Sequence, residues 1–339
     1  MKKLLALALA GVMVFSLAAC GAKEEAVEET AKEETTEEVT EEPAEEAAPE
    51  TVTVAVKDAE GNLIDVEFPV APERIVVLNY QTMDFLDAVG MGDRVVGFIK
   101  GGAPEHLKKY EDDENIANVG GMKDVDMEMV MSLEPDVIFS SDRTAKMYNE
   151  FSAIAPTMSA AVDYKGGSFM EGYKTLAANH AAIMGVGSEV DEIIAGYDER
   201  IAAIREIGEG KTALLGIFAD GLNTLGNEGR CNILVTDMGF ENLAGDENVN
   251  HGNVSSYEAW LEMNPEYMFV LDKDTAVGTE AVAAKEQMET DNPVIAETDA
   301  YKNGKIIYLE PGANWYIADG GITSMDSMLT CVEEGLGIK

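Results

Sequence analysis

One segment occurs twice in the chain, and each copy ends in a cation. Residues 128–143 (EMVMSLEPDVIFSSDR) align without gaps with residues 258–273 (EAWLEMNPEYMFVLDK), matching a glutamate, a proline, a phenylalanine and a terminal acid–cation pair. Each copy predicts a short amphipathic helix that stops at the proline, followed by a buried strand. Arg143 and Lys273 then lie at the carboxyl ends of two strands, which is where open α/β sheets bind their ligands. Cations at this position predict the binding of an anion.

Two alternatives remain open for these cations. A helix, a proline and a strand form a common connection in α/β proteins, so the match can arise by chance, although the shared acid–cation pair favours a true repeat. Each cation can also form an ion pair with its neighbour, Asp142 or Asp272, instead of binding a ligand. If the repeat is real, it predicts two similar lobes that face each other.

The sequence lacks the common catalytic and metal-binding motifs. It contains no Gly-x-Ser-x-Gly, no His-Glu-x-x-His and no glycine-rich phosphate loop after a strand. Its histidines and cysteines are His106, His180, His251, Cys20, Cys231 and Cys331. No cysteine pair has the spacing of a zinc site, and Cys231 and Cys331 either form a disulfide or remain two buried thiols. We therefore expect a protein that is not an enzyme.

The acidic composition limits the possible partners. A formal net charge of −40 at pH 7 argues against nucleic acid. Part of this charge lies in residues 21–50, which are mostly Glu, Ala and Thr and predict a solvated, disordered tether. The remainder is also acidic, but a few cations in a cleft can still create a positive local field.

The N-terminus has the pattern of a secretory leader. Lys2 and Lys3 precede an apolar run over residues 4–17, and the small residues of the segment LAAC at 17–20 predict a cleavage site. The run is short for a membrane-spanning helix. The segment resembles a bacterial lipobox, in which Cys20 receives the lipid and becomes the mature N-terminus; an ordinary leader or a retained anchor is the alternative. The resemblance implies an extracytoplasmic protein, lipid-anchored to the bacterial cell membrane.

One long helix is predicted to divide the folded part of the chain. Apolar residues recur at steps of four and three from Val190 to Ile204, so they share one face. Ser188 is expected to cap the N-terminus of this helix, and Gly208 to follow its last turn. The predicted leader, tether, N-terminal lobe, connecting helix and C-terminal lobe occupy residues 1–20, 21–50, 51–187, 188–208 and 209–339.

Both lobes alternate between strand and helix patterns. The first contains a predicted hairpin at 51–68, strands at 72–78 and 94–98, and helices at 83–89 and 172–184. The second contains predicted strands at 212–218 and 305–309, and helices at 232–238 and 322–336. Strand, helix and strand at this spacing predict parallel pairing. The expected fold class is α/β, with two doubly wound, Rossmann-like lobes joined by a single long α-helix and a ligand cleft between them.

Four motifs give the chain a resemblance to a known family. They are KNGKIIYL at 302–309, NWYIA at 314–318, HGNVS at 251–255 and SDRTAKMY at 141–148. In combination they resemble the ferric-siderophore-binding lipoproteins of bacterial ABC importers, especially the petrobactin and catecholate binders, from about residue 51 to the C-terminus. The resemblance implies a monomeric, helix-linked binding protein without a permanently bound cofactor. Its implied partners are a ferric catecholate siderophore and an ABC permease dimer with a cytoplasmic ATPase.

The resemblance also implies how the iron is held. Catecholate oxygens are hard donors that suit ferric iron, and a tetradentate chelator leaves two positions of the ion open. In the family, the histidine of a His-Gly-x-Val-Ser motif and the tyrosine of a Trp-Tyr-Leu-Ala motif fill these positions. They correspond to His251 and Tyr316, with Ile317 replacing the leucine. A hexadentate chelator would instead be held only from outside, by charge and stacking.

Further site residues follow from the same resemblance. Arg143, Arg230 and Lys273 correspond to its basic positions, which offset the charge of the anionic chelate. The family commonly has arginine where this chain has Lys273, and lysine keeps the charge but loses the planar fork. Tyr80 and Trp315 are candidate walls of the cleft, with packing in the core as the alternative.

Two glutamates have a different implied role. In the family, one glutamate on the outer face of each lobe docks on arginines of the permease dimer, and Glu128 and Glu258 match these positions within the repeat. The alternative is that both are ordinary exposed acids. Haem, a corrinoid or a bare metal ion remain possible ligands of the same scaffold, since histidine and tyrosine also ligate haem. A single helical link predicts that the lobes close only slightly around a ligand.

Overall fold

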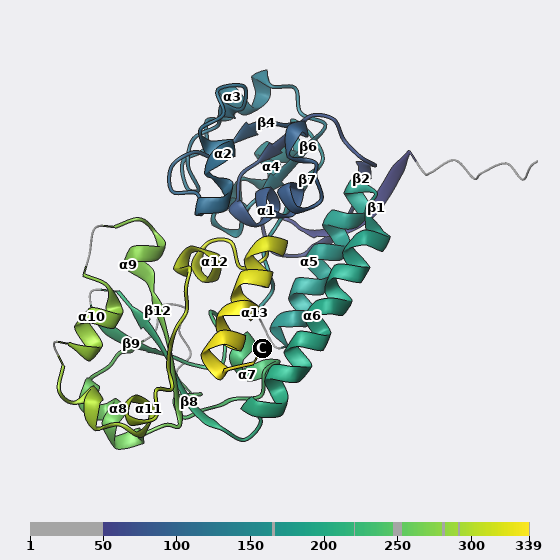
Figure 1. Cartoon of the computed structure of the whole chain (residues 1–339). Coiled ribbons are helices and arrows are strands. Elements are labelled where there is room, and N and C mark those ends of the chain that lie inside the picture. Colours follow the sequence, from purple (N-terminus) through teal and green to yellow (C-terminus); the bar gives the residue numbers. More distant parts are fainter. Residues whose placement is uncertain are drawn as a thin grey trace, which may run out of the picture. The chain divides into compact units, whose positions relative to one another are not determined.

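The computed structural model describes residues 50–164, 167–219, 221–246, 253–279, 282–290 and 292–338. The predicted leader and nearly all of the predicted tether lie outside this part of the chain. Contacts group residues 48–339 into one unit, which contains two α/β lobes, each built on its own sheet (Figure 1). No helix in the described ranges is long and apolar enough to cross a lipid bilayer.

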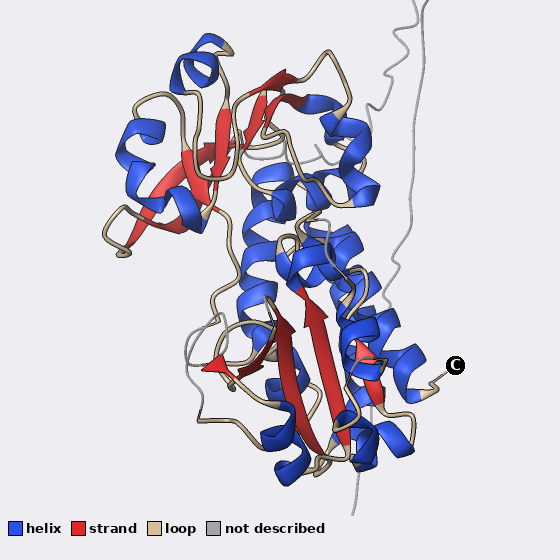
Figure 2. Ribbon diagram, turned by 90° about the vertical axis from the view of Figure 1, so that its left-hand side faces the viewer, coloured by secondary structure: helices blue, strands red, loops and turns tan. Residues whose placement is uncertain are grey.

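The N-terminal sheet is the upper one in Figure 2. It has five parallel strands in the order β5-β4-β3-β6-β7. These strands are β3 (Ile75–Val77), β4 (Val95–Phe98), β5 (Ala117–Asn118), β6 (Val137–Ser140) and β7 (Thr157–Ser159). Strands β4 and β5 lie on one side of β3, whereas β6 and β7 lie on the other. The winding direction therefore changes between β3 and β6, as in doubly wound sheets, and the predicted parallel pairing is confirmed.

The helices of the N-terminal lobe are short, and polar side chains cap several of them. They are α1 (Tyr80–Ala88), α2 (Lys108–Glu111), α3 (Met127–Ser132) and α4 (Tyr148–Ser152), with 3-10 turns at Gly92–Arg94, Glu105–Leu107 and Asp142–Met147. Helix α1 begins earlier than predicted because Asn79 caps it by accepting the N–H of Thr82 at 2.7 Å.

The predicted hairpin is confirmed as antiparallel β1 (Thr51–Lys57) and β2 (Leu63–Pro69).

The C-terminal sheet mixes parallel and antiparallel strands. Its order is β11-β9-β8-β12-β13, with β10 also paired to β8. The strands are β8 (Thr212–Phe218), β9 (Leu222–Leu225), β10 (Glu241–Asn242), β11 (Asn253–Val254), β12 (Tyr267–Asp272) and β13 (Ile306–Tyr308). Strands β8, β12 and β13 are parallel, but β9 is antiparallel to β8. The connection from Phe218 to Leu222 is too short for the helix that a parallel crossover needs.

The remaining helices belong to the C-terminal lobe or pack beside it. They are α7 (Ile233–Thr236), α8 (Tyr257–Met263), α9 (Lys273–Ala276), α10 (Ala284–Glu289), α11 (Asp299–Lys302), α12 (Gly312–Tyr316) and α13 (Ile322–Leu336), with a 3-10 turn at Ile295–Glu297. Helix α13 packs against α1 of the N-terminal lobe as well as against α6 and α12. Cys231 and Cys331 are both free thiols.

The two copies of the repeat adopt the same local structure. Helices α3 and α8 are capped by Asp126 and Ser256, and each cap accepts the backbone N–H three residues further on. Glu134 and Asn264, which precede the two prolines, both have positive φ angles, of 46° and 43°. A residue before proline is kept out of the helical region, so each helix ends at this point, and β6 and β12 follow.

The long connecting helix does not cross between the lobes alone. Helix α6 (Gly187–Gly208) lies beside α5 (Phe169–Met184), and Gly185, with φ of 73°, joins the two (Figure 1). The first residue of α5 donates its N–H to Thr236 in α7 of the C-terminal lobe, at 3.2 Å. Ser188 is not the N-cap, which was a wrong prediction. The left-handed glycine lets α6 begin directly after α5, with Val186 as its cap.

The apolar face predicted for α6 is buried in a core that extends through both lobes. Val190, Tyr197, Ile201 and Ile204 are at most 7% exposed and belong to the same cluster as the interior of both sheets. A second cluster around Trp260 lies on the other face of the C-terminal sheet. The lobes are therefore held together by continuous apolar packing and not only by chain connections.

One polar ring lies within this core. His180 is 1% exposed, and its ring stacks on Phe85 with the centroids 4.9 Å apart. Its Nδ1 faces the carbonyl of Leu176 at 3.0 Å and must hold the proton, so Nε2 accepts the hydroxyl of Thr82 at 2.9 Å. Burial lowers the pKa of His180 to about 4, so the ring is neutral near pH 7.

This histidine should make stability depend on pH. Between about pH 6.5 and about 4, His180 binds a proton in the unfolded chain but not in the folded chain. The free energy of unfolding therefore falls as the pH falls, by about 3 kcal/mol over this window. His180→Gln, which keeps one donor and one acceptor, should lose this part of the pH dependence. Urea unfolding of wild type and His180→Gln across this pH window measures the difference. A His180→Gln profile parallel to wild type would contradict the assignment.

Candidate functional site

Residues from both lobes line a cleft beside the change of winding between β3 and β6. The cleft has about 480 Å³ of empty space, including its open mouth. Its N-terminal wall is formed by Asn79, Gln81, Met122, Ser141, Asp142, Arg143, Ala161, Val162 and Tyr164, and its C-terminal wall by Arg230, Tyr316, Ile317 and Asp319. Doubly wound sheets bind their ligands at this position.

A buried asparagine joins the two segments of the N-terminal wall. Asn79 follows β3, and its Nδ2 donates to the carbonyls of Phe139 and Ser140 in β6, at 3.3 and 3.0 Å. These bonds hold the start of α1 against the segment that follows β6. Arg143 lies exposed on that segment, and among the described residues it has no acidic partner, Asp142 included. Its guanidinium is therefore free to meet an anion in the cleft.

An arginine and a tyrosine stack on the C-terminal wall. The guanidinium of Arg230 lies over the ring of Tyr316, 3.9 Å from the centroid, and its Nη1 donates to the Tyr316 carbonyl. Tyr316 is 6% exposed, at the end of α12. The Nε of Arg230 is buried and has no partner in the described structure. The stack holds the cation at the wall by a cation–π contact and one hydrogen bond, and leaves other guanidinium nitrogens for a ligand.

A buried acid lies beside this pair and connects both walls. Tyr164 donates its hydroxyl to Asp319, and Gln81 on α1 donates to the same carboxylate at 3.4 Å. Burial raises the pKa of Asp319, and the charge of Arg230 and the bond from Tyr164 oppose this rise. Burial, and then the charge of Asp319, raise the pKa of Tyr164 well above its ordinary value, so its hydroxyl stays protonated and can donate.

The walls thus contain two cations and two acids. Arg143 and Arg230 line the same cleft from its two walls, and Asp142 and Asp319 line it as well. Asp319, Tyr164 and Gln81 were not identified from the sequence, because no motif or spacing marks them. Because acids lie beside the cations on these walls, an anion would have to be recognised by the placement of individual donors rather than by a strong net positive field.

Three expected site residues do not line the cleft. Lys273 is half-buried at the start of α9, and no ion pair joins it to Asp272, whose carboxylate accepts the backbone N–H groups of Thr275 and Ala284. Tyr80 is 1% exposed, with its hydroxyl bonded to the Gly101 carbonyl at 3.1 Å. Trp315, also 1% exposed, is in the core. For both aromatic residues, the structure supports core packing.

The remaining expected residues lie elsewhere. His251 is outside the described residues. Glu128 and Glu258 are exposed in the first turns of α3 and α8, at equivalent positions of the repeat. Figure 1 shows α3 and α8 at the outer ends of the two lobes. In the part of the chain that is described, no cluster of three or more acidic, histidine or cysteine side chains could hold a metal ion.

A second hollow lies between α6 and α13. Arg200 is one of the residues that line it, and this side chain is already paired with Asp326 and Glu333, each at 2.6 Å. The hollow is wide open to solvent, and its cation is neutralised. The cleft between the walls, where unpaired donors from both lobes converge, is therefore the better candidate for ligand binding.

The fold and the cleft define a two-lobed substrate-binding protein. A family model described as periplasmic binding protein matches residues 75–313, which include most of both lobes. The chain belongs to this family, whose members bind substrates and are not enzymes.

Individual relatives support the assignment. The petrobactin-binding protein YclQ of Bacillus subtilis is 35% identical over 274 residues, which are 79% of this chain and 84% of that protein. Its crystal structure matches with a TM-score of 0.77 and 32% identity, over 85% of this chain and 99% of that one. The periplasmic catecholate-siderophore-binding protein VctP of Vibrio cholerae matches with a TM-score of 0.76 and 27% identity, over 84% and 100%.

A further relative is known only by its class. The uncharacterized ABC transporter substrate-binding lipoprotein YvrC of Bacillus subtilis is 26% identical over 270 residues, which are 76% of this chain and 78% of that protein. Together these findings confirm the resemblance seen in the sequence and the two-lobed α/β fold.

Proposed function

We propose that the protein captures a ferric catecholate siderophore outside the cytoplasm and delivers it, as a monomer, to an ABC permease. The observation on which this depends is the stack of Arg230 on Tyr316, which faces a cleft that also contains the unpaired Arg143. The names of YclQ and VctP, which specify petrobactin and catecholate siderophores, support the same ligand class. The iron arrives with its chelator, so no permanently bound cofactor is required.

The proposed iron ligands are Tyr316 and His251. A tetradentate catecholate leaves two positions on ferric iron, which one phenolate and one imidazole can complete. The guanidinium over the Tyr316 ring supports this role, because a cation 3.9 Å from the centroid stabilises the negative charge of an iron-bound phenolate. For His251 the support is its place in the HGNVS motif.

Cations supply the second part of the proposed site. Arg143 and Arg230 approach the chelate from the two walls, and each can donate to catecholate oxygens, which are strong acceptors. Lys273 follows β12 as Arg143 follows β6 and has no acidic partner among the described residues, so it is proposed to contribute charge from outside the cleft lining. Tyr80 and Trp315 are buried in the core, so no direct ligand contact is proposed for them.

Ligand capture can be tested by visible absorption titration with ferric petrobactin and with a ferric tetradentate catecholate. Wild type should bind tightly with a shift of the charge-transfer band. Tyr316→Phe and His251→Ala should each abolish that shift and weaken binding by roughly tenfold to a hundredfold, since a charge-assisted contact contributes about 1.5–3 kcal/mol. Arg230→Lys should weaken binding without abolishing the shift.

A matched control and two distinct failures complete this test. Tyr301→Phe removes an exposed tyrosine hydroxyl on α11, outside the cleft lining, and should leave the titration unchanged. Tight binding that neither ligand substitution affects would keep siderophore capture and reject the direct iron contacts. No binding by wild type would reject siderophore capture, and haem and a corrinoid would then be titrated in the same way.

Delivery is proposed to use Glu128 and Glu258 as docking contacts for the permease. This proposal is supported by the exposure of both glutamates at equivalent positions on the outer ends of the two lobes. Two similar permease subunits need two similar contacts. Glu128→Lys with Glu258→Lys should abolish uptake of the ferric chelate by cells while leaving its affinity for the purified protein unchanged. Glu199→Lys, an exposed charge reversal on α6, is the control. Normal uptake by the double variant would remove the docking role.

Attachment to the membrane is proposed to occur through lipid on Cys20. The lipobox-like segment at 17–20 supports it, as does the lipoprotein name of the relative YvrC. Cys20→Ala should abolish incorporation of labelled palmitate and release the protein from the membrane fraction, because the lipid is the proposed anchor and no helix in the described ranges could cross a bilayer. Cys331→Ser should keep the label. A variant without Cys20 that stays in the membrane fraction and keeps the label would contradict the proposal.

A further inference from the structure

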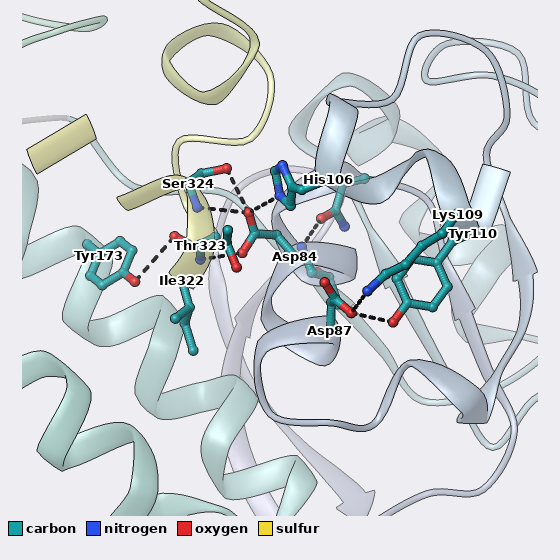
Figure 3. A network of polar contacts seen from close by, with 12 residues as sticks. Asp84, Asp87, His106, Lys109, Tyr110, Tyr173, Ile322, Thr323 and Ser324 are labelled. Carbon is teal, nitrogen blue, oxygen red and sulfur yellow. Dashed lines mark hydrogen bonds and ion pairs between the residues drawn. The ribbon is translucent and has the colours of Figure 1, made fainter. Parts of the chain in front are cut away.

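A buried carboxylate of the N-terminal lobe caps the C-terminal helix of the chain (Figure 3). Asp84 on α1 is 0% exposed, and its Oδ1 accepts the backbone N–H of Thr323 at 2.7 Å. Its Oδ2 accepts the N–H and the hydroxyl of Ser324, at 3.0 and 2.7 Å, and lies 2.8 Å from Nε2 of His106. We propose that Asp84 is a positioning residue that fixes the two lobes relative to each other through the first turn of α13.

The cap joins elements that the sheets alone would leave separate. Helix α1 follows β3 of the N-terminal sheet, whereas α13 follows α12 and β13 of the C-terminal lobe. The connecting helices hold the same turn from the other side, since the Tyr173 hydroxyl donates to the Gly321 carbonyl at 3.4 Å and the Tyr197 hydroxyl to the Ile322 carbonyl at 2.8 Å. Elements from both lobes and from the link between them therefore meet at one helix terminus.

The chemistry of this contact is specific for an ionised carboxylate. Each oxygen of Asp84 faces donors only, and the N-terminus of a helix favours negative charge. An asparagine would turn its amide N–H₂ toward some of these donors and leave them unpaired in a buried place. Space is equally restricted, because a Cβ on Gly321 would lie 2.3 Å from the carboxyl carbon of Asp84.

The position of the cap matters for the cleft. Asp319 and Tyr316 line the C-terminal wall shortly before Gly321, and Gln81 lines the N-terminal wall one turn before Asp84 on α1. Fixing α1 to the first turn of α13 therefore fixes the spacing of both walls close to where they meet. Any opening of the lobes must pivot about this contact, or break it.

Asp87 provides a matched control on the same helix. Its carboxylate accepts the hydroxyl of Tyr110 and pairs with Lys109 at 2.6 Å, so both partners lie in the N-terminal lobe (Figure 3). Asp87→Asn removes an equivalent charge and destabilises one lobe without touching α13. A loss of local stability alone would thus affect both variants, whereas a loss of lobe positioning would affect only Asp84→Asn.

The experiment measures the distance between the lobes in the ligand-free full chain. Spin labels at Lys123 and Glu262, both exposed, report on the two lobes by double electron–electron resonance. The native cysteines are replaced by serine in every sample. Wild type and Asp87→Asn should give the same narrow distance distribution, and Asp84→Asn a broader one shifted to longer distances. Ser324→Ala, which removes one of the bonds, should shift it in the same direction by less.

The outcomes separate this inference from the proposed function. No ligand is present, so a failure of siderophore binding does not affect the result. An Asp84→Asn distribution equal to that of Asp87→Asn overturns the positioning role. If Asp84→Asn does not fold, Gly321→Ala takes its place in the experiment. The added Cβ, on the α13 side of the contact, must displace the Asp84 carboxylate. An unchanged distribution in folded Gly321→Ala would then reject the proposal.

Discussion

The cleft depends on the order of the strands in the N-terminal sheet. Because β3 and β6 are neighbours and the chain winds away from them in opposite directions, the segments that follow them separate and leave an opening. Asn79 bridges the two segments through bonds to the end of β6, so the opening keeps a fixed shape. Arg143 lies in the turn that follows β6 and lines this opening. Without the change of winding, a helix would cover the same edge.

The C-terminal lobe completes the site by a different route. Its sheet contains an antiparallel hairpin, β8–β9, and the loop after β9 brings Arg230 against α12. The guanidinium is held by the ring and carbonyl of Tyr316 and lies near the buried Asp319, whose charge opposes its own in sign. An arginine restrained in this way loses little conformational freedom when a ligand binds, which favours affinity. The same restraint sets the direction from which an anion can approach.

Features determined by neighbouring residues could be predicted from the sequence. The prolines at 135 and 265, the apolar face of α6 and the β1–β2 hairpin all depend on short patterns, and the structure has each of them. The start of α6 was wrong, because the left-handed Gly185 joins α5 and α6 more tightly than a cap at Ser188 requires. That α5 also reaches the C-terminal lobe was missed, because its contact with Thr236 joins residues that are far apart in the sequence.

The part of the site that depends on distant residues could not be predicted. Tyr164 donates to Asp319 from 155 residues upstream, and Ser324 donates to Asp84 from 240 residues downstream. Neither acid has a motif, and an isolated aspartate is most often an exposed one. Lys273 and Arg143 end matching segments, yet only Arg143 lines the cleft, because α9 begins at once after β12 and its packing against α12 determines where Lys273 lies. A repeat in sequence thus predicts local structure better than it predicts which surface faces a ligand.

The continuous core has a consequence for how such a protein can release a ligand. Separating the lobes would expose apolar residues of α6 and α13 that are now at most 7% exposed, at a cost of about 25 cal/mol for each Å² of apolar surface. Large hinge opening is therefore expensive for the isolated protein, in agreement with the small closure expected of helix-linked lobes. Opening the cleft would require energy from outside the isolated protein, and it would have to loosen the packing of α13 against α1 and α6. The contacts that fix the spacing of the two walls are then the same contacts that must loosen before the cleft can open.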